Sequence, residues 1–433
     1  MSSLLVRGGT VVDEHDARRG DVLIADGRIA DDTAQRPDQE FDATGLHVLP
    51  GVVDAHVHFN EPGRTEWEGF LRGTAAAAAG GVTTVADMPL NCHPPTLDVR
   101  ALAIKRGAVA EHARVDYAFW GGVVPQSLEH LAELRDAGVV GVKAFLCDSG
   151  LAEYPPLDEF CLLDVMQRCA ELGLLLALHA ESPVHLGAAT GMGSPIAWAR
   201  SRPPRAEVEA VRMALETARV TGARLHFVHI STAEAARLVA QARGEGLDVT
   251  QETCPHYLTL DESDLERLGA VAKCAPPLRS RSTVDALWQA VVDGEVDLIA
   301  SDHSPCPPAM KAVDDIWSAW GGISGVQMTL PLVLSGQRLS LPRVVQLLCA
   351  NPARRLGLYP RKGALLAGSD ADIAIVDLDA DWTLHEQDLH SRWPLSPFVG
   401  RTLRGRVVAT FVRGQLVYRD GVVLGEPGFG RAA

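Results

Sequence analysis

Two histidines one residue apart, His56 and His58, are the first side chains along the chain whose types and spacing could bind a metal ion. Residues i and i+2 of a β-strand share one face, so both imidazoles could reach a single ion. Asp54 lies on the same face one step deeper, where we expect it to support a ligand rather than bind the ion. The pair alone is a weak signal, and its meaning depends on what the rest of the chain supplies.

Other apolar runs also end in side chains that bind metals, at His179, His229 and Asp302. A histidine at one strand end is most often only hydrogen-bonded. Ligand-type residues at the ends of several strands, however, indicate a common site. Imidazole and carboxylate groups are ligands that zinc and similar divalent ions favour in proteins.

Lys143 lies inside the apolar run 141–146, where burying an ammonium group is costly. One interpretation is that Lys143 pairs with a nearby carboxylate. The other is that its neutral amine takes up carbon dioxide and forms a carbamate, whose two oxygens can bridge two cations.

With the carbamate, these side chains form a binuclear metal centre. His56, His58 and Asp302 would hold one ion, His179 and His229 the second, and Lys143 would bridge them. Two ions roughly 3.5–4 Å apart can share a bridging hydroxide as nucleophile, while one of them polarises a carbonyl. Asp302 would pass the proton of the hydroxide to the leaving nitrogen. The set predicts a hydrolase that cleaves an amide bond.

Eight apolar runs, separated by helix-like stretches, must position these side chains. They are 52–58, 82–86, 115–121, 141–146, 174–179, 224–229, 248–253 and 297–301. Apolar rather than alternating runs are typical of parallel strands buried on both faces. Eight β/α units predict an α/β fold with a (β/α)8 TIM-like barrel, whose active site lies at the carboxyl ends of the strands. For the first helix we expect a capping box at Thr65 and Glu68 and a stop at Gly80-Gly81.

Both ends of the chain consist of short strands. Residues 4–7 and 11–12 flank Gly8-Gly9, and Asp26-Gly27 is a strong hairpin signal. Near the carboxyl end the expected strands are 371–377, 406–412, 415–418 and 422–424. Because neither end can close a core alone, we expect one small β-sandwich domain from residues 1–49 and 358–433, and a barrel domain from 50–357.

The composition is that of a soluble globular protein, with 47% hydrophobic and 22% charged residues among 433. A net charge of −15 disfavours partners such as nucleic acid or an anionic membrane. We see no signal peptide and no apolar stretch near the ~20 residues of a membrane helix, so a cytoplasmic location is expected. The eight cysteines have no C-x-x-C spacing and are expected as buried, reduced thiols.

Taken together, these residues resemble the amidohydrolase superfamily, and within it the cyclic amidohydrolases: dihydroorotases, dihydropyrimidinases (hydantoinases) and allantoinases. The resemblance covers nearly the whole chain and is strongest to the allantoinases. The stretches that carry it are 58–69 (HFNEPGRTEWEG), 87–91 (DMPLN), 252–258 (ETCPHYL), 302–308 (DHSPCPP), 320–323 (WGGI) and 396–402 (SPFVGRT).

The resemblance implies a function: hydrolysis of the hydantoin-ring amide of allantoin to allantoate, in ureide degradation. It implies two divalent ions, with zinc the first expectation and cobalt, manganese, iron or nickel open, together with a carboxylated lysine and a homotetramer. The implied ligands are His56, His58, Lys143, His179, His229 and Asp302.

Two positions favour a neutral substrate. Asn60 stands where dihydroorotases place an arginine for the substrate carboxylate, and Asp148 where dihydropyrimidinases place a tyrosine. For substrate binding we expect Ser304 to donate to a ring carbonyl. Asn91 is expected either to bind substrate or to form a turn. Two alternatives remain: a hydantoinase acting on other cyclic amides, and a non-catalytic scaffold, which would typically have lost metal ligands.

Overall fold

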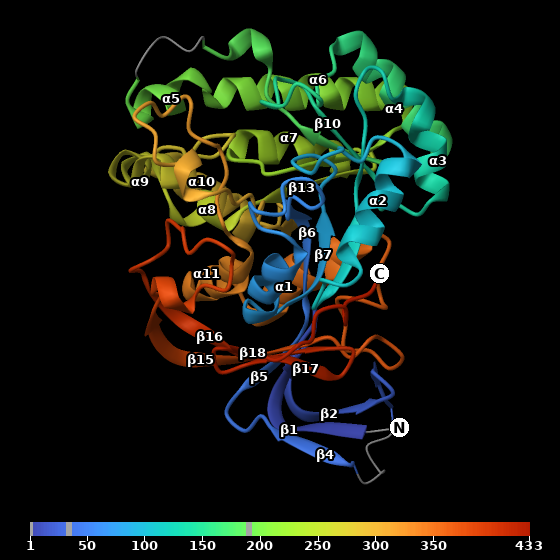
Figure 1. Ribbon diagram of the computed structural model, residues 1–433, viewed down its shortest axis with the longest axis vertical. Helices are drawn as coiled ribbons and strands as arrows, with labels where there is room; N and C mark the ends of the chain where they lie inside the picture. The colour runs from blue at the N-terminus through green and yellow to red at the C-terminus, as the bar shows by residue number, and fades with distance from the viewer. Residues whose placement is uncertain (1–2, 32–36, 188–192) are drawn as a thin grey trace.

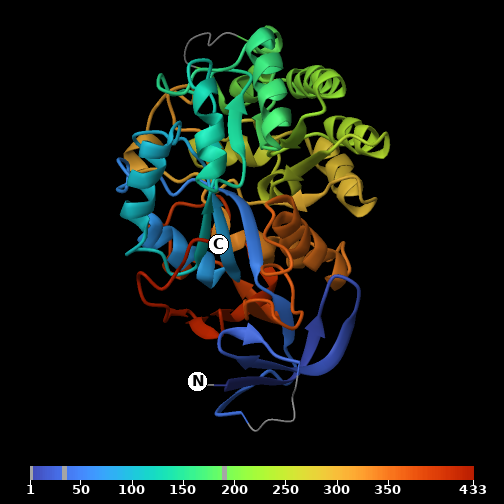
Figure 2. The ribbon, with the colours of Figure 1, turned by 90° about the vertical axis from the view of Figure 1, so that its right-hand side faces the viewer.

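The computed structural model describes residues 3–31, 37–187 and 193–433, which form a barrel with its helices above a sheet made by the two chain ends (Figure 1). Figure 2 shows the same two layers from the side, with the first described residues of the chain in the sheet and the C-terminus beside the barrel. The last residues reach the barrel, since Ala432 bridges to Tyr117.

Eight parallel strands make the barrel, as the apolar runs predicted. They are β6 (Val52–Val57), β7 (Val82–Asp87), β8 (Asp116–Phe119) continued by β9 (Gly121–Gly122), β10 (Val142–Phe145), β11 (Leu175–His179), β12 (Arg224–Phe227), β13 (Val249–Thr253) and β14 (Leu298–Ile299). Strand pairing runs from β6 through β7 to β8, and from β9 to β14 in chain order. A parallel bridge between Val57 and His303 joins the last strand to the first and closes the ring.

Helices follow the strands around the barrel. They are α1 (Phe70–Ala79), α2 (Val99–Val109), α3 (Leu131–Asp136), α4 (Glu159–Leu172), α5 (Pro195–Ser201), α6 (Pro204–Thr221), α7 (Ala233–Gly244), α8 (Pro255–Thr259), α9 (Glu262–Leu268), α10 (Arg281–Val292), α11 (Thr329–Ser335), α12 (Leu341–Val345) and α13 (Asn351–Arg355). None of the described helices is long and apolar enough to cross a membrane.

The start of α1 differs from the prediction. The helix begins at Phe70 after Gly69, without a side-chain cap, so the capping box of Thr65 and Glu68 is wrong. Glu61 accepts a hydrogen bond from the Phe70 backbone N–H at 2.7 Å instead, which satisfies one of the free donors at the helix start. The predicted stop at Gly80-Gly81 is confirmed.

The two chain ends share one nine-stranded sheet. Its strands are β1 (Ser3–Val12), β2 (Ala17–Ala25), β3 (Arg28–Ile29), β4 (Gln39–Asp42), β5 (His47–Pro50), β15 (Ile373–Thr383), β16 (Thr402–Val412), β17 (Gln415–Arg419) and β18 (Val422–Val423). The N-terminal strand β5 pairs with the C-terminal strand β15 and joins the two halves. The halves pack on each other as the predicted sandwich, with the rings of Phe41 and Phe411 edge to face at 5.4 Å.

The turns of this sheet follow the sequence signals, with one exception. Asp26-Gly27, Arg413-Gly414 and Asp420-Gly421 all have positive φ at both positions, as two-residue hairpin turns require. Gly8-Gly9, in contrast, does not separate two strands. It lies at a register shift within the continuous strand β1, where Gly8 takes φ +73° and lets the strand bulge.

A buried ionic cluster lies where the sheet meets the barrel. The Lys362 ammonium contacts Asp116 at 2.5 Å, Asp372 at 2.8 Å and Asp370 at 3.0 Å. Asp116 begins barrel strand β8, while Asp370 and Asp372 directly precede sheet strand β15. One lysine therefore ties the two parts of the fold together.

Candidate active site

The carboxyl ends of the barrel strands open into a cavity of about 430 Å³. All six predicted metal ligands line it, although they are spread over almost 250 residues of sequence: His56, His58, Lys143, His179, His229 and Asp302. His56 lies in β6 and His58 directly follows it, and each of the other four lies in or follows a different strand. Closure of the barrel therefore brings the six side chains together.

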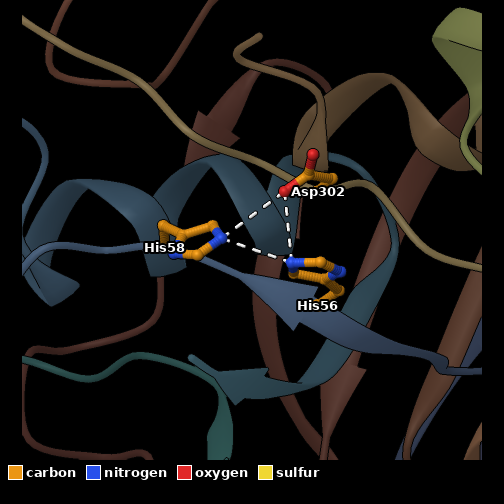
Figure 3. Close-up of side chains that lie close together, drawn as sticks. All are labelled: His56, His58 and Asp302. Atoms are coloured by element: carbon orange, nitrogen blue, oxygen red, sulfur yellow. Dashed lines mark hydrogen bonds and ion pairs between the residues drawn. The ribbon is translucent and has the colours of Figure 1, made fainter. Parts of the chain in front are cut away.

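The first cluster consists of His56, His58 and Asp302 (Figure 3). The two Nε2 atoms are 3.2 Å apart, and Asp302 Oδ1 lies 3.2 Å from His56 Nε2 and 3.5 Å from His58 Nε2. Ligand atoms about 2.0–2.2 Å from a tetrahedral zinc ion are themselves roughly 3.3 Å apart. The spacing of the three donor atoms therefore fits one divalent ion.

The second cluster is formed by His179 and His229. His179 Nδ1 lies 3.0 Å from His229 Nε2, and the far nitrogen of His179 donates to Glu181 at 2.8 Å. Burial is the largest influence on both imidazoles and lowers their pKa, that of His229 well below the usual value. Neutral imidazole is the form that binds a metal ion, so this pair also suits ligation.

Lys143 is buried without a charged partner. Its Nζ makes no hydrogen bond or ion pair with any residue in 3–31, 37–187 or 193–433, and lies 5.2 Å from the Phe145 ring centre. Burial lowers the pKa of Lys143 to about 8, despite the opposing charges of Glu252 and Asp302. The carboxylate pairing considered for this lysine is therefore not found among the described residues, and the amine is disposed to lose its proton.

Two of the ligand-type residues have left-handed backbone conformations. His229 has φ 42° and Asp302 has φ 44°. Strand β12 stops at Phe227 and β14 at Ile299, earlier than the predicted runs 224–229 and 297–301, so both residues lie in the loops beyond the observed strand ends. Such conformations cost about 1–3 kcal/mol each in non-glycine residues and cluster at functional sites. The turns aim both side chains into the cavity.

Buried carboxylates complete the electrostatics. Burial raises the pKa of Asp302, but the surrounding histidines His56, His58 and His229 outweigh it and hold the pKa well below the usual range. The same balance, set by His56 and His226, holds Glu252 at a pKa of about 2. Both carboxylates are therefore ionised at neutral pH.

Glu252 is a residue that the sequence reasoning missed. The only sequence signal was a carboxylate inside an expected barrel strand, and it was weak because its neighbours in 248–253 (DVTQET) are also polar.

Both predicted substrate-binding residues, Ser304 and Asn91, line the cavity, as does Asp148, one of the two positions that favour a neutral substrate. The Asn91 side-chain amide also lies 3.2 Å from His58 Nδ1, so it can orient this histidine. Asn60 is not among the lining residues; its amide donates to the Pro305 carbonyl at 3.3 Å.

Three tryptophans and two basic side chains form another part of the cavity wall. Trp198, Trp317 and Trp320 line the cavity. Arg202 pairs with Glu181, and Lys273 donates to the backbone carbonyls of Trp317 and Ala319. Arg202 is therefore paired with a carboxylate, whereas the Lys273 ammonium is held by carbonyl oxygens alone.

The sequence matches the model of the Amidohydrolase family over residues 47–417. The chain therefore belongs to the amidohydrolase family, whose members generally depend on two metal ions.

Within this family, the chain is similar to enzymes that act on cyclic amides. The allantoinase of Rubrobacter xylanophilus is 47% identical over 98% of this chain and 96% of its own length. The allantoinase of Solibacter usitatus is 47% identical over 96% of this chain and 94% of its own. Among solved structures, the L-hydantoinase (dihydropyrimidinase) of Arthrobacter aurescens superimposes with a TM-score of 0.96 at 35% identity, covering 99% of both chains.

Proposed function

We propose that this protein is an allantoinase that hydrolyses the hydantoin-ring amide of allantoin to give allantoate. The observation that carries the proposal is the 47% identity to proteins named allantoinase over nearly the full chain. A cavity lined by a complete set of ligand-type side chains agrees with it.

We further propose that His56, His58 and Asp302 hold one divalent ion and that His179 and His229 hold the second. Lys143 would carry a carboxylate and bridge them. Zinc is the proposed metal, although cobalt, manganese, iron and nickel accept the same ligands. The donor-atom spacing and the unpaired, buried amine support this assignment.

Two bound divalent ions would lower the pKa of an intervening water and polarise the amide carbonyl. The side chains of the protein would transfer the proton and orient the substrate. Asp302 would take the proton of the attacking water and deliver it to the ring nitrogen as the carbon–nitrogen bond breaks. The products are a carboxylate and a ureido nitrogen, which is the bond change from allantoin to allantoate. Ser304 and Asn91 would orient the ring. Trp198, Trp317 and Trp320, which line the cavity, would limit the access of water.

The test is allantoate formation by the purified protein, before and after incubation with metal and bicarbonate. We expect activity to need both additions after chelation. Rates on allantoin, phenylhydantoin and dihydrouracil should be compared side by side. If allantoin is the poorest of the three, the name allantoinase is wrong and the protein is a hydantoinase, which the close superposition on an L-hydantoinase would then explain. A protein that binds no metal would instead be a scaffold.

The broader organisation follows from the same resemblance. We propose a cytoplasmic homotetramer in which residues 50–357 form the catalytic barrel domain and residues 1–49 and 358–433 the β-sandwich domain. Light scattering on the purified protein measures the oligomeric state, and a monomer would refute the tetramer.

A further inference from the structure

The seventh barrel strand, β13, supplies none of the six proposed ligands, yet one of its side chains touches both metal clusters. The Glu252 carboxylate is fully buried. Its Oε1 lies 2.5 Å from His56 Nδ1 and 3.4 Å from the backbone nitrogen of His229. Glu252 therefore contacts one residue of each metal cluster: His56 of the first and His229 of the second.

The contact with His56 determines where that imidazole keeps its hydrogen. A carboxylate oxygen can only accept, so Nδ1 of His56 donates to it. Nε2 then presents its lone pair toward His58 and Asp302, which is the orientation that ligation needs.

The contact with His229 acts on the backbone. His229 has φ 42°, a conformation that an ordinary side chain adopts only when its surroundings enforce it. The Glu252 carboxylate oxygen accepts a hydrogen bond from the His229 N–H and so stabilises this conformation. The His229 ring also lies 5.5 Å from the His56 ring, so a shift of either histidine affects the other.

Glu252 is itself held by a third histidine. His226 Nε2 donates to Glu252 Oε2 at 3.1 Å, and His226 Nδ1 contacts the Thr250 hydroxyl at 2.8 Å. The His226 ring stacks on Trp120 with 13° between the ring planes. The carboxylate therefore has little freedom to rotate away from the clusters.

We propose that Glu252 is a positioning residue that couples the two halves of the metal centre, by orienting His56 for the first ion and fixing the backbone of His229 for the second. This inference rests on the proposed assignment of His56 and His229 as ligands. It predicts that one substitution on β13, a strand that supplies no metal ligand, lowers the affinity of the protein for both ions.

The decisive variant is Glu252→Gln, which keeps the size of the side chain. A carboxamide has one accepting oxygen and one donating NH2 group, so it cannot accept from both His56 and His226 as the carboxylate does, and it carries no charge. We expect the affinity for both zinc ions to fall by about 10–100-fold, the usual effect of losing a residue that orients metal ligands. The measurement is titration of the chelator-treated protein with zinc against a competing chelator, with circular dichroism to verify folding.

Two further variants control for general damage to β13. Thr250→Val removes the hydroxyl on the far side of His226 and leaves Glu252 in place, so both zinc affinities should stay within about 3-fold of wild type. Glu252→Asp keeps the charge with a shorter reach and should bind zinc more tightly than Glu252→Gln. It also preserves the test if the glutamine variant does not fold.

Three results would overturn the inference. Wild-type zinc affinity in folded Glu252→Gln would make Glu252 merely structural. Loss of a single ion would refute the coupling. A wild-type protein that binds no zinc would remove the ligand assignment and this inference together, whereas failure to act on allantoin with two ions bound would overturn only the proposed substrate.

Discussion

Two buried lysines, one at the barrel mouth and one at the junction with the sheet, have opposite surroundings. Lys143 and Lys362 are both 1% exposed. Lys362 contacts three carboxylates within 3.0 Å, from Asp116, Asp370 and Asp372. Lys143 contacts no carboxylate among the described residues, and burial lowers its pKa to about 8.

The difference separates a structural charge from a reactive group. A buried ammonium that is fully paired stabilises the arrangement of the elements that supply its partners, and removing it leaves unpaired carboxylates. A buried amine without a partner has a weakened hold on its proton, which is the condition for nucleophilic chemistry. The same residue type thus joins two parts of the fold in one place and is available for reaction in the other.

The largest expected effect comes from Lys143→Met. The variant cannot form a carbamate, so allantoate formation should fall by roughly 10³-fold or more, about 4 kcal/mol of barrier. The thermal midpoint of the metal-free protein should stay equal or rise, because an unpaired buried amine is replaced by an apolar side chain. Activity within ten-fold of wild type would exclude a bridging role.

Lys362→Met should do the reverse. Removing the ammonium leaves the buried carboxylates of Asp370 and Asp372 without this cation, while Asp116 keeps Arg413, and should lower the free energy of unfolding by about 3–5 kcal/mol. The specific activity of the folded fraction should change little, because the cluster lies at the junction with the sheet and not at the cavity. Chemical unfolding followed by circular dichroism measures the first effect and assays below the unfolding transition the second. Stability equal to wild type would contradict the structural role.

The pH dependence of reactivation sharpens the comparison. Only the neutral amine of Lys143 reacts with carbon dioxide, and its neutral fraction grows as pH rises toward the folded pKa of about 8. Reactivation of the metal-free protein, at a fixed concentration of dissolved carbon dioxide, should accelerate about ten-fold per pH unit from 6 to 7 and level off above 8 to 9. A rate that keeps climbing through pH 10 would indicate an ordinary lysine.

The smallest expected effect concerns substrate binding at the barrel mouth. Ser304→Ala should lower kcat/KM for allantoin by about 3–10-fold, the value of one hydrogen bond, with two metal ions retained. Ser318→Ala is the matched control, because that hydroxyl donates to the Asp315 backbone at 2.9 Å. Its kcat/KM should not change. Equal effects of the two substitutions would remove Ser304 from the substrate contacts.

Much of the fold was predictable from local patterns. Eight apolar runs correspond to eight barrel strands, and the dipeptides Asp26-Gly27, Arg413-Gly414 and Asp420-Gly421 are tight turns. These predictions succeed because burial on both faces and positive φ restrict residue choice position by position. Residue type and strand position also brought together the six candidate ligands, since all carboxyl ends of barrel strands meet on one face.

What the sequence determined by itself is therefore the order of elements, the buried faces and the chemical types at the barrel mouth. Only the tertiary structure decided which groups touch. It left Lys143 unpaired and surrounded Lys362 with carboxylates, turned Asn60 toward Pro305, and placed Glu252 beneath His56 and His229. The physical reason is that periodicity and turn chemistry act over a few residues, whereas these contacts join segments up to 246 residues apart and exist only once the chain has folded.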